Sequence, residues 1–282
     1  MDFLELKAHA KINIGLQIKN KRPDGYHNIH TVFQEVALHD VIKIQKQPHG
    51  IDISIDWPGI PTDNMNTCAK AYLAAKEIFP NLGGISLTIS KKIPPGAGLG
   101  GGSSDAASVL KGLIQLYDLS VSEKELFGIA TKIGADVPFF IASGTQIGNG
   151  IGDLLKPIYK PINGFYLLVI PDISISTAWA YKAIKKHLNK NLDRPNFANY
   201  FERSKLSKAI FDNDFERIVV PAYPKIGEII DEFSAKGAFF TSLSGSGSTV
   251  YGIFGDEAKA KQAESIFQKQ YRTILTKPTN LN

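Results

Sequence analysis

The chain has 282 residues, of which 43% are hydrophobic and 21% are charged. This balance is typical of a globular protein and excludes a disordered one. The opening segment MDFLELKAHAKINIGLQI carries acidic and basic residues among its apolar ones, so we expect no signal peptide, no membrane partner and a cytoplasmic location. Cys68 is the single cysteine, which excludes an internal disulfide and a multi-cysteine zinc site and predicts a buried, inert thiol.

The formal net charge is +5, which raises the question of a nucleic-acid partner. The basic residues are spread along the chain, however, and their densest run, at 183–194, is typical of a solvated helix end. We therefore expect no nucleic-acid partner. A small anionic substrate suits this charge equally well.

Alternating apolar residues predict strands in the first part of the chain. In KINIGLQI at 11–18 the isoleucines and Leu16 alternate with polar or small residues, which places Lys11 and Asn13 on the face away from the core. Similar patterns predict strands at 30–38, 40–46, 50–57 and 84–90. The first domain therefore begins as a mainly antiparallel sheet.

Apolar residues at helical spacing predict three helices in the first domain. Asp63 is the predicted N-cap of a helix that includes Cys68 and Tyr72. A second helix follows the glycine-rich stretch PPGAGLGGGSSDAA at 94–107. Ser122 and Glu125 form a capping box for a third helix, which should run to about Ile133 and end at Gly134, just before a turn at Asp136.

A glycine- and proline-rich connection at 148–164 separates two halves, so we predict domains at 1–155 and 156–282. The second half should contain a strand at 165–171, helices near 177–188, 224–236 and 256–270, and a strand after the glycines of SLSGSGSTVYGIF at 242–254.

The stretch PPGAGLGGGSSDAA opens a helix, whose N-terminus offers unpaired N–H groups and a partial positive charge to an anion. Glycines let these groups approach phosphate oxygens closely. A P-loop is excluded because its lysine is absent, and the match to a dinucleotide fingerprint is weak because SKKIPP intervenes after the strand. The alternative to a phosphate site is a tight structural turn.

Several polar residues allow more than one interpretation. Asp136 lies where a carboxylate could be held rigidly in a cleft, but a turn aspartate that bonds its own backbone is equally common. Lys11 and Asn13 could be plain surface residues. His27 and His30 have no third ligand within sequence reach, so we expect hydrogen-bonding or surface histidines rather than a metal site.

Three segments together resemble the motifs of the GHMP kinases: AKINIGLQI the first, PPGAGLGGGSSDAA the second and SLSGSGSTVYGIF the third, in the family's order over nearly the whole chain. The resemblance implies an α+β, two-domain GHMP kinase fold. Its N-terminal domain would be ribosomal protein S5 domain 2-like, and its C-terminal domain ferredoxin-like.

The stretch RPDGYH, together with GADVPFF, resembles one branch of this family. That branch transfers the γ-phosphate of ATP, with Mg²⁺, to the 2-hydroxyl of a cytidine-diphosphate-linked methylerythritol in isoprenoid precursor synthesis. The residues that would then bind ATP are Pro94, Pro95, Gly96, Ala97, Gly98, Leu99, Gly100, Gly101, Gly102, Ser103 and Ser104 around the triphosphate, with Asn64 near the adenine.

The same resemblance implies Asp136 as general base, with Lys11 beside it to keep the carboxylate ionised and to stabilise the developing alkoxide. The residues that would bind the acceptor substrate are Asn13, Tyr26, His27, Tyr181, Gly245, Ser246 and Gly247. Two alternatives stay open: another GHMP kinase, of the mevalonate or homoserine type, and an RNA-binding module.

Overall fold

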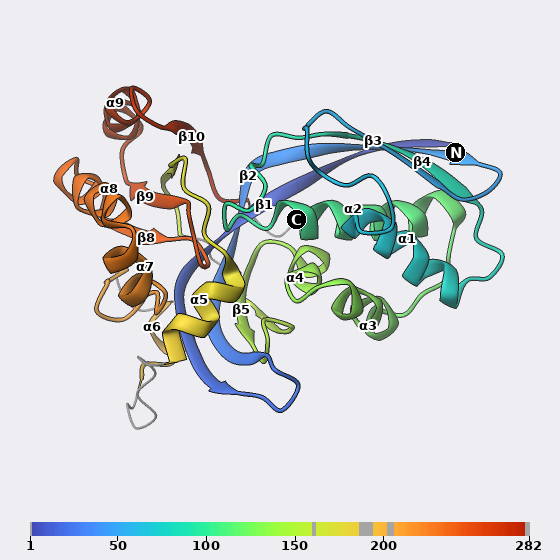
Figure 1. Ribbon diagram of the computed structural model, residues 1–282, viewed down its shortest axis with the longest axis horizontal. Coiled ribbons are helices and arrows are strands. Elements are labelled where there is room, and N and C mark those ends of the chain that lie inside the picture. Colours follow the sequence, from blue (N-terminus) through green and yellow to red (C-terminus); the bar gives the residue numbers. More distant parts are fainter. Residues whose placement is uncertain (1, 160–161, 186–193, 202–205, 280–282) are drawn as a thin grey trace. The chain divides into compact units, whose positions relative to one another are not determined.

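The computed structural model describes residues 2–159, 162–185, 194–201 and 206–279 (Figure 1). Its contacts divide the chain into two compact units that interleave along the sequence. The first unit comprises Met1–Ala10, Leu38–Pro95 and Gly100–Ser143. The second comprises Lys11–Ala37, Gly96–Leu99 and Gly144–Asn282. Neither unit is a continuous stretch of chain.

Two long strands contribute residues to both units: β1 (Phe3–Lys21) and β2 (His27–Gln47). The segments 30–38 and 40–46, predicted as two strands, are parts of this single strand β2. In the first unit, the last part of β2 pairs antiparallel with β4 (Gly84–Ser90), and β4 pairs parallel with β3 (Ile51–Ile55).

Four helices belong to the first unit: α1 (Thr67–Ile78), α2 (Gly101–Tyr117), α3 (Glu123–Ile133) and α4 (Val137–Ala142). Within this unit they lie on one side of strands β3 and β4 (Figure 1). Helix α2 packs very closely on the strands at Gly112, where a Cβ atom would lie 2.2 Å from the Cδ1 atom of Ile44. The predicted helix after the glycine-rich stretch is confirmed.

The start of α1 differs from the prediction. Its N-cap is Asn66, whose side-chain oxygen accepts a hydrogen bond from the N–H of Cys68 at 2.8 Å. Asp63, the predicted cap, instead accepts from the N–H of Met65 at 2.9 Å and closes a turn before the helix. An aspartate and an asparagine three residues apart are equally good caps by type, and local sequence does not separate them.

The ends of α3 follow the sequence closely. The capping box is present: Ser122 accepts from the N–H of Glu125 at 3.2 Å, and Glu125 accepts from the N–H of Ser122 at 2.9 Å. Gly134 follows the last helical residue, as predicted, with an extended backbone. Cys68 is buried, as expected, and burial raises the pKa of its thiol well above the usual value.

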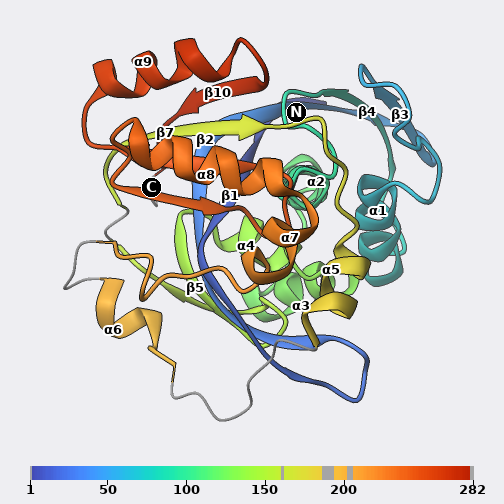
Figure 2. The same ribbon diagram turned by 60° about the vertical axis from the view of Figure 1, so that its left-hand side comes forward.

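The second unit contains a four-stranded antiparallel sheet in the order β10-β7-β9-β8. Its strands are β7 (Phe165–Ile170), β8 (Phe240–Leu243), β9 (Val250–Phe254) and β10 (Arg272–Thr276). Helices α8 (Pro224–Ala235) and α9 (Glu257–Phe267) lie along this sheet (Figure 2). Strands and helices in the order βαββαβ with this strand order form the ferredoxin-like arrangement that was expected.

The core of this sheet joins both helices to the strands through buried side chains such as Leu167, Phe233, Val250 and Phe267. The remaining elements of the unit are β5 (Thr145–Asn149), β6 (Leu154–Pro157), α5 (Thr177–Ile184), α6 (Phe197–Phe201) and α7 (Glu216–Ala222). The sequence did not predict α6 or α7, which are short. The basic run at 183–194 falls largely outside the described residues.

A membrane-crossing helix would need a long apolar stretch, and none of the helices in the part of the chain that the structure describes has one.

Candidate active site

The glycine-rich stretch is divided between the two units, and the portion Gly96–Leu99 belongs to the second. Gly98 has a φ of 79°, and a Cβ atom there would lie 2.2 Å from the carbonyl oxygen of Ser244. The hydroxyl of Ser244 donates to the carbonyl oxygen of Gly98 at 2.9 Å. Protein packing therefore requires glycine at position 98. At Gly96 a Cβ atom would meet nothing within 4 Å.

The portion from Gly100 onward belongs to the first unit and starts helix α2. Gly100 is the N-cap with a φ of 73°, a left-handed conformation that favours glycine. Gly102 is exposed, and a Cβ atom there would contact only the hydroxyl of Thr67, at 3.4 Å. The N–H groups of the first turn of a helix have no partner within that helix. The start of α2 can therefore bind an anion, with Ser103 and Ser104 in the same turn.

A buried ion cluster that the sequence did not reveal lies behind the start of α2. The ammonium of Lys91 is 2.7 Å from a carboxylate oxygen of Asp105 and also contacts a carboxylate oxygen of Asp40. The other oxygen of Asp40 accepts from the N–H of Ile93 at 2.8 Å. Three side chains thus attach the residues that precede the glycines to the first turns of α2. The partners are far apart in sequence, so no local sequence pattern predicts this cluster.

Burial is the main influence on the charges of this cluster. It raises the pKa of Asp105 to about 7, although the charge of Lys91 acts in the opposite direction, and the negative charge of Asp40 raises the pKa further. One ammonium is therefore shared by two buried carboxyl groups.

Lys11 and Asn13 lie on β1 in the second unit and are buried, with 4% and 1% of their surface exposed. The interpretation of these residues as plain surface is therefore wrong, because both faces of β1 are covered at this point. The ammonium of Lys11 donates to the side-chain oxygen of Asn13 at 2.7 Å and lies 5.5 Å from the ring centroid of Phe33. The side-chain nitrogen of Asn13 donates to Thr31 at 3.0 Å. These contacts hold a buried cation in one position.

The loop at 244–247, from the third glycine-rich segment, lies against this pair within the second unit. A Cβ atom on Gly245 would be 3.5 Å from the Asn13 side-chain oxygen, 3.6 Å from the carbonyl oxygen of Gly98 and 3.7 Å from the Lys11 ammonium. The hydroxyl of Ser246 lies 3.0 Å from that of Thr177. The structure thus brings the first and third segments together with Gly98 of the second, and Gly247 belongs to the same loop.

The RPDGYH stretch forms the turn between β1 and β2. Gly25 has a φ of 91°, and the carboxylate of Asp24 accepts from the N–H of Tyr26 at 3.1 Å. The side chain of Tyr26 is 57% exposed, whereas His27 is buried. The His27 and Tyr181 rings stack with centroids 5.2 Å apart and planes inclined by 18°.

The imidazole of His27 is polar but poorly solvated. Burial, followed by the charges of Lys185 and Lys21, lowers its pKa, so the ring is neutral at pH 7. Its Nε2 atom is buried and has no hydrogen-bond partner among the described residues. By contrast, His30 accepts from the N–H of Phe197 at 3.0 Å and lies 2.8 Å from the Asn149 side-chain oxygen, so it is the hydrogen-bonding histidine that was expected.

The remaining predicted residues lie in the first unit. Asp136 is half-buried and directly precedes α4, and Asn64 is exposed in the segment before α1. Pro94 and Pro95 precede the glycines. Among the described residues, no group of three or more His, Cys, Asp or Glu side chains could hold a metal ion.

Two family models match the chain and define its class. The GHMP kinases N terminal domain matches residues 66–144, and the GHMP kinases C terminal domain matches residues 182–273. Solved structures agree on the fold. A homoserine kinase from Cytophaga hutchinsonii superposes with a TM-score of 0.71 at 16% identity, covering 99% of this chain and 95% of its own. The chain therefore has the two-domain GHMP kinase fold.

Relatives that match over the whole length of the chain define its family more narrowly. Two proteins named 4-diphosphocytidyl-2-C-methyl-D-erythritol kinase, from Chlorobium chlorochromatii and Acetivibrio thermocellus, are 39% and 37% identical. The matches cover 97% and 98% of this chain and 96% and 99% of the relatives. A crystal structure of 4-(cytidine 5'-diphospho)-2C-methyl-D-erythritol kinase has a TM-score of 0.84 at 29% identity and covers 99% of this chain and 100% of its own. The chain belongs to the family of 4-diphosphocytidyl-2-C-methyl-D-erythritol kinases.

Proposed function

We propose that this protein transfers the γ-phosphate of ATP to the 2-hydroxyl of 4-diphosphocytidyl-2-C-methyl-D-erythritol, a step in non-mevalonate isoprenoid precursor synthesis. The observation that carries this proposal is the identity of 37–39% with kinases of that name over nearly the whole of both chains. GHMP kinases of other substrates share the fold at much lower identity. A reaction that consumes ATP also fits the cytoplasmic location that we expected.

In this proposal Tyr26, His27 and Tyr181 recognise the cytosine. The stacked pair of His27 and Tyr181 offers flat ring surfaces, and the Nε2 atom of His27 is a buried polar atom with no hydrogen-bond partner among the described residues. A buried polar atom without a partner costs free energy, which a hydrogen bond from a ligand would recover. A cytosine has both a ring face and an edge of donors and acceptors, so it matches this arrangement.

The triphosphate of ATP would lie along Pro94–Ser104, with the adenine near Asn64. The exposed glycines and the first turn of α2 support this assignment, because they leave backbone N–H groups accessible. Mg²⁺ is usually held by substrate phosphates with one or two protein groups, so the chain's donor set fits an ion that arrives with ATP. We assign the half-buried Ser103 as the hydroxyl that could contact it, because Ser104 is only 2% exposed. When bound, the ion neutralises charge on the phosphates.

Asp136 is proposed as the general base that accepts the proton of the 2-hydroxyl, and Lys11 as the cation that stabilises the developing alkoxide. The hydrogen bond to Asn13 and the contact with Phe33 support the role of Lys11, since they hold its ammonium in one position. Gly245, Ser246 and Gly247 complete the acceptor side of the site.

We also propose that the N-terminal domain spans residues 1–155 and the C-terminal domain residues 156–282. The two family models fall on either side of this boundary, at 66–144 and 182–273.

The test is a phosphate-transfer assay with magnesium ATP and four acceptors: the cytidine-linked methylerythritol, the same tetritol without its cytidine diphosphate, mevalonate and homoserine. We expect turnover with the first alone. Turnover with mevalonate or homoserine, and none with the cytidine-linked compound, would overturn the proposal. An RNA filter-binding titration over increasing salt addresses the alternative function, and we expect only weak, salt-sensitive binding.

A further inference from the structure

A short segment before α7, at 212–214, is attached to strand β1. The N–H of Leu16 donates to the carbonyl oxygen of Asp212 at 2.9 Å, and the N–H of Asp214 donates to the carbonyl oxygen of Leu16 at 2.8 Å. These bonds form a parallel bridge between Leu16 and Asn213. The segment therefore has a fixed register on the strand that carries the buried lysine and asparagine described above.

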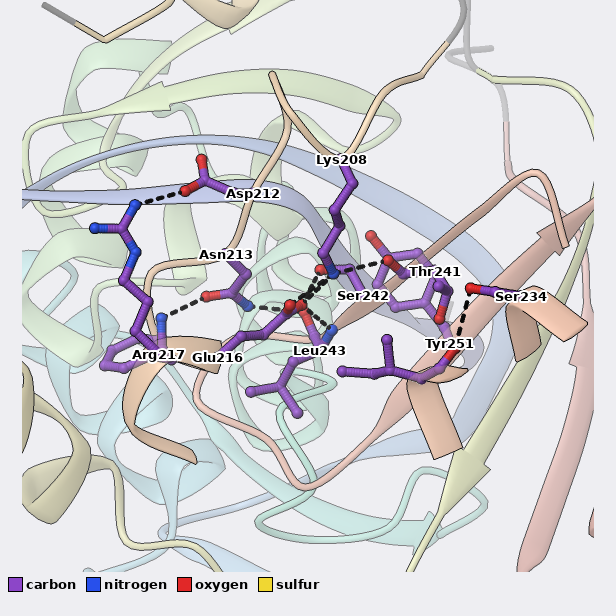
Figure 3. A network of polar contacts seen from close by, with 12 residues as sticks. Lys208, Asp212, Asn213, Glu216, Arg217, Ser234, Thr241, Ser242, Leu243 and Tyr251 are labelled. Atoms are coloured by element: carbon purple, nitrogen blue, oxygen red, sulfur yellow. Dashed lines mark hydrogen bonds and ion pairs between the residues drawn. The ribbon is translucent and has the colours of Figure 1, made fainter. Parts of the chain in front are cut away.

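The side chain of Asn213, which is 2% exposed, points toward Leu243 at the end of strand β8 (Figure 3). Its amide nitrogen donates to the carbonyl oxygens of Leu243 and Gly245 at 2.8 and 2.9 Å. Its amide oxygen accepts from the N–H of Phe215 at 3.0 Å. Both N–H groups and the oxygen of this amide thus form hydrogen bonds. The two N–H groups bond the last residue of β8 and the glycine loop at 244–247.

A neighbouring group of residues holds strand β8 without reaching the loop (Figure 3). The carboxylate of Glu216 accepts from the N–H of Leu243 at 2.9 Å and from the hydroxyl of Ser242 at 2.7 Å. The ammonium of Lys208 donates to Glu216 at 2.7 Å and to the carbonyl oxygen of Thr241 at 2.9 Å. Glu216 and Lys208 therefore hold strand β8, whereas Asn213 bonds both the last residue of this strand and Gly245 in the loop.

The bond to Gly245 also fixes the direction of a backbone donor. A trans peptide is planar, with its C=O and N–H pointing to opposite sides. Because the carbonyl of Gly245 points toward Asn213, the N–H of Ser246 in the same peptide points away from it. Gly245 itself lies against Asn13 and Lys11, with a φ of 57°. The side chain of Asn213 thus sets how this peptide is presented beside the buried cation.

We propose that Asn213 is a positioning residue for the phosphoryl transfer: its amide orients the peptide between Gly245 and Ser246 so that a backbone N–H faces the anionic, diphosphate-bearing acceptor near Lys11. This inference rests on the proposed function. Asn213 acts through the loop and does not touch the substrate. The bridge to β1 adds to the effect, because one segment sets the position of both the strand and the loop.

The test is Asn213→Asp, which keeps the size and the acceptor for Phe215 but puts an oxygen in place of the donor to two carbonyl oxygens. At about pH 8 we expect kcat/KM for the cytidine-linked substrate to fall by about 10-fold or more, because two hydrogen bonds are lost and repulsion replaces them. As the pH is lowered to about 6, the ratio of variant to wild-type activity should rise. A buried carboxyl protonates readily, and its O–H restores one donor.

The matched control is Lys208→Met, which removes two hydrogen bonds from the same network but none to the loop. It should lower the Tm and leave kcat and KM unchanged when assayed below both melting temperatures. A role of Asn213 in stability alone predicts wild-type kcat/KM for folded Asn213→Asp, or an equal loss in Lys208→Met, and either result would overturn the proposal. If Asn213→Asp does not fold, Asn213→Ser, which keeps one donor, is measured against the same control.

The wild-type protein is assayed first with the four acceptors. If it phosphorylates only a different alcohol, the proposed function is wrong, and the variants are then compared with that alcohol. The two proposals therefore fail separately.

Discussion

The imidazole of His27 lies nearly parallel to the ring of Tyr181, with centroids 5.2 Å apart and planes inclined by 18°. Tyr181 in turn meets the ring of Phe215 edge-on, with centroids 5.0 Å apart. A ring held in this way loses little further conformational entropy when a ligand binds. The pair is therefore a preformed surface, and its contribution to binding can be measured by removing one ring.

His27→Ala should raise KM for the cytidine-linked substrate by roughly 5- to 150-fold, which corresponds to about 1–3 kcal/mol for an unpaired buried partner. KM for ATP should stay the same, because the adenine is assigned elsewhere. Steady-state titration of each substrate measures both values. His30→Ala is the control: His30 is also buried, but its ring nitrogens bond within the protein, so the variant should melt earlier without a selective change in KM. Equal losses for both nucleotides in His27→Ala would contradict the assignment.

Gly102→Ala tests the phosphate assignment of the glycine stretch. The new methyl group would contact only Thr67, at 3.4 Å, so the Tm should be unchanged or slightly higher, while KM for ATP should rise by about 10-fold or more. Gly100 and Gly101 are less suitable positions for such a change. The φ of Gly100 is 73°, and a Cβ atom on Gly101 would lie 3.0 Å from a neighbouring side chain.

The matched control for this change is Gly128→Ala in helix α3, where a Cβ atom would meet nothing within 4 Å. It should raise the Tm, because alanine is favoured over glycine inside a helix, and it should leave KM for ATP unchanged. Wild-type ATP binding in both alanine variants would mean that no phosphate lies against Gly102.

Asp136→Asn keeps the size of the side chain but removes the proposed base, so kcat should fall by at least about 10²-fold with little change in substrate binding. Because phosphoryl transfer can be loose and depend mainly on positioning, a smaller loss would make Lys11→Met the more damaging change. Rapid-quench measurement of a single turnover distinguishes the chemical step from product release. Asp153→Asn, a turn aspartate that accepts from the N–H of Ile151, should have wild-type turnover. Near wild-type rates in both Asp136→Asn and Lys11→Met would show that the catalytic pair has been assigned wrongly.

Asp105→Asn should change how stability depends on pH. Burial raises the pKa of Asp105 to about 7, well above the value of about 3.9 in an unfolded chain. Between these values the native state holds a proton that the unfolded state has released, so the free energy of unfolding falls as the pH rises. The variant has no carboxyl group at this position, so its free energy of unfolding lacks this pH dependence.

We therefore expect the Tm of the wild type, relative to Asp105→Asn, to fall between about pH 4 and about pH 7 in thermal melts. Ser108→Ala, a buried change without a titrating group on the same helix, should shift the Tm equally at every pH. A constant difference between wild type and Asp105→Asn would indicate that Asp105 stays ionised across this range.

The parts of the fold that the sequence predicted well are those with a local cause. Alternation in β4 and the capping box of Ser122 and Glu125 were readable because each depends on residues within a few positions of one another. The burial of Lys11 was not readable, since the polar face of β1 is covered by segments far away in sequence.

The same reason explains the residues that sequence reasoning missed. Asn213 precedes a short helix, and its role depends on bonds to a loop 30 and 32 residues away. The cluster of Lys91, Asp40 and Asp105 joins three separate segments. The motif FDNDFERIV offered one usable signal: adjacent asparagine and aspartate residues among large apolar ones predict polar groups that must find partners if they are buried.

The attachment of β1 to the segment before α7 has a consequence for synthesis. The N–H of Ile18 donates to the carboxylate of Asp214, 196 positions later in the chain. At translation rates of about 5–20 residues per second, roughly 10–40 s pass between the emergence of these two residues from the ribosome. During that time the apolar residues of β1 that belong to the second unit lack their final partners. Nascent chains stalled before Asp214 should therefore be degraded readily by protease at these residues, and slower translation of the second half should increase the need for chaperones.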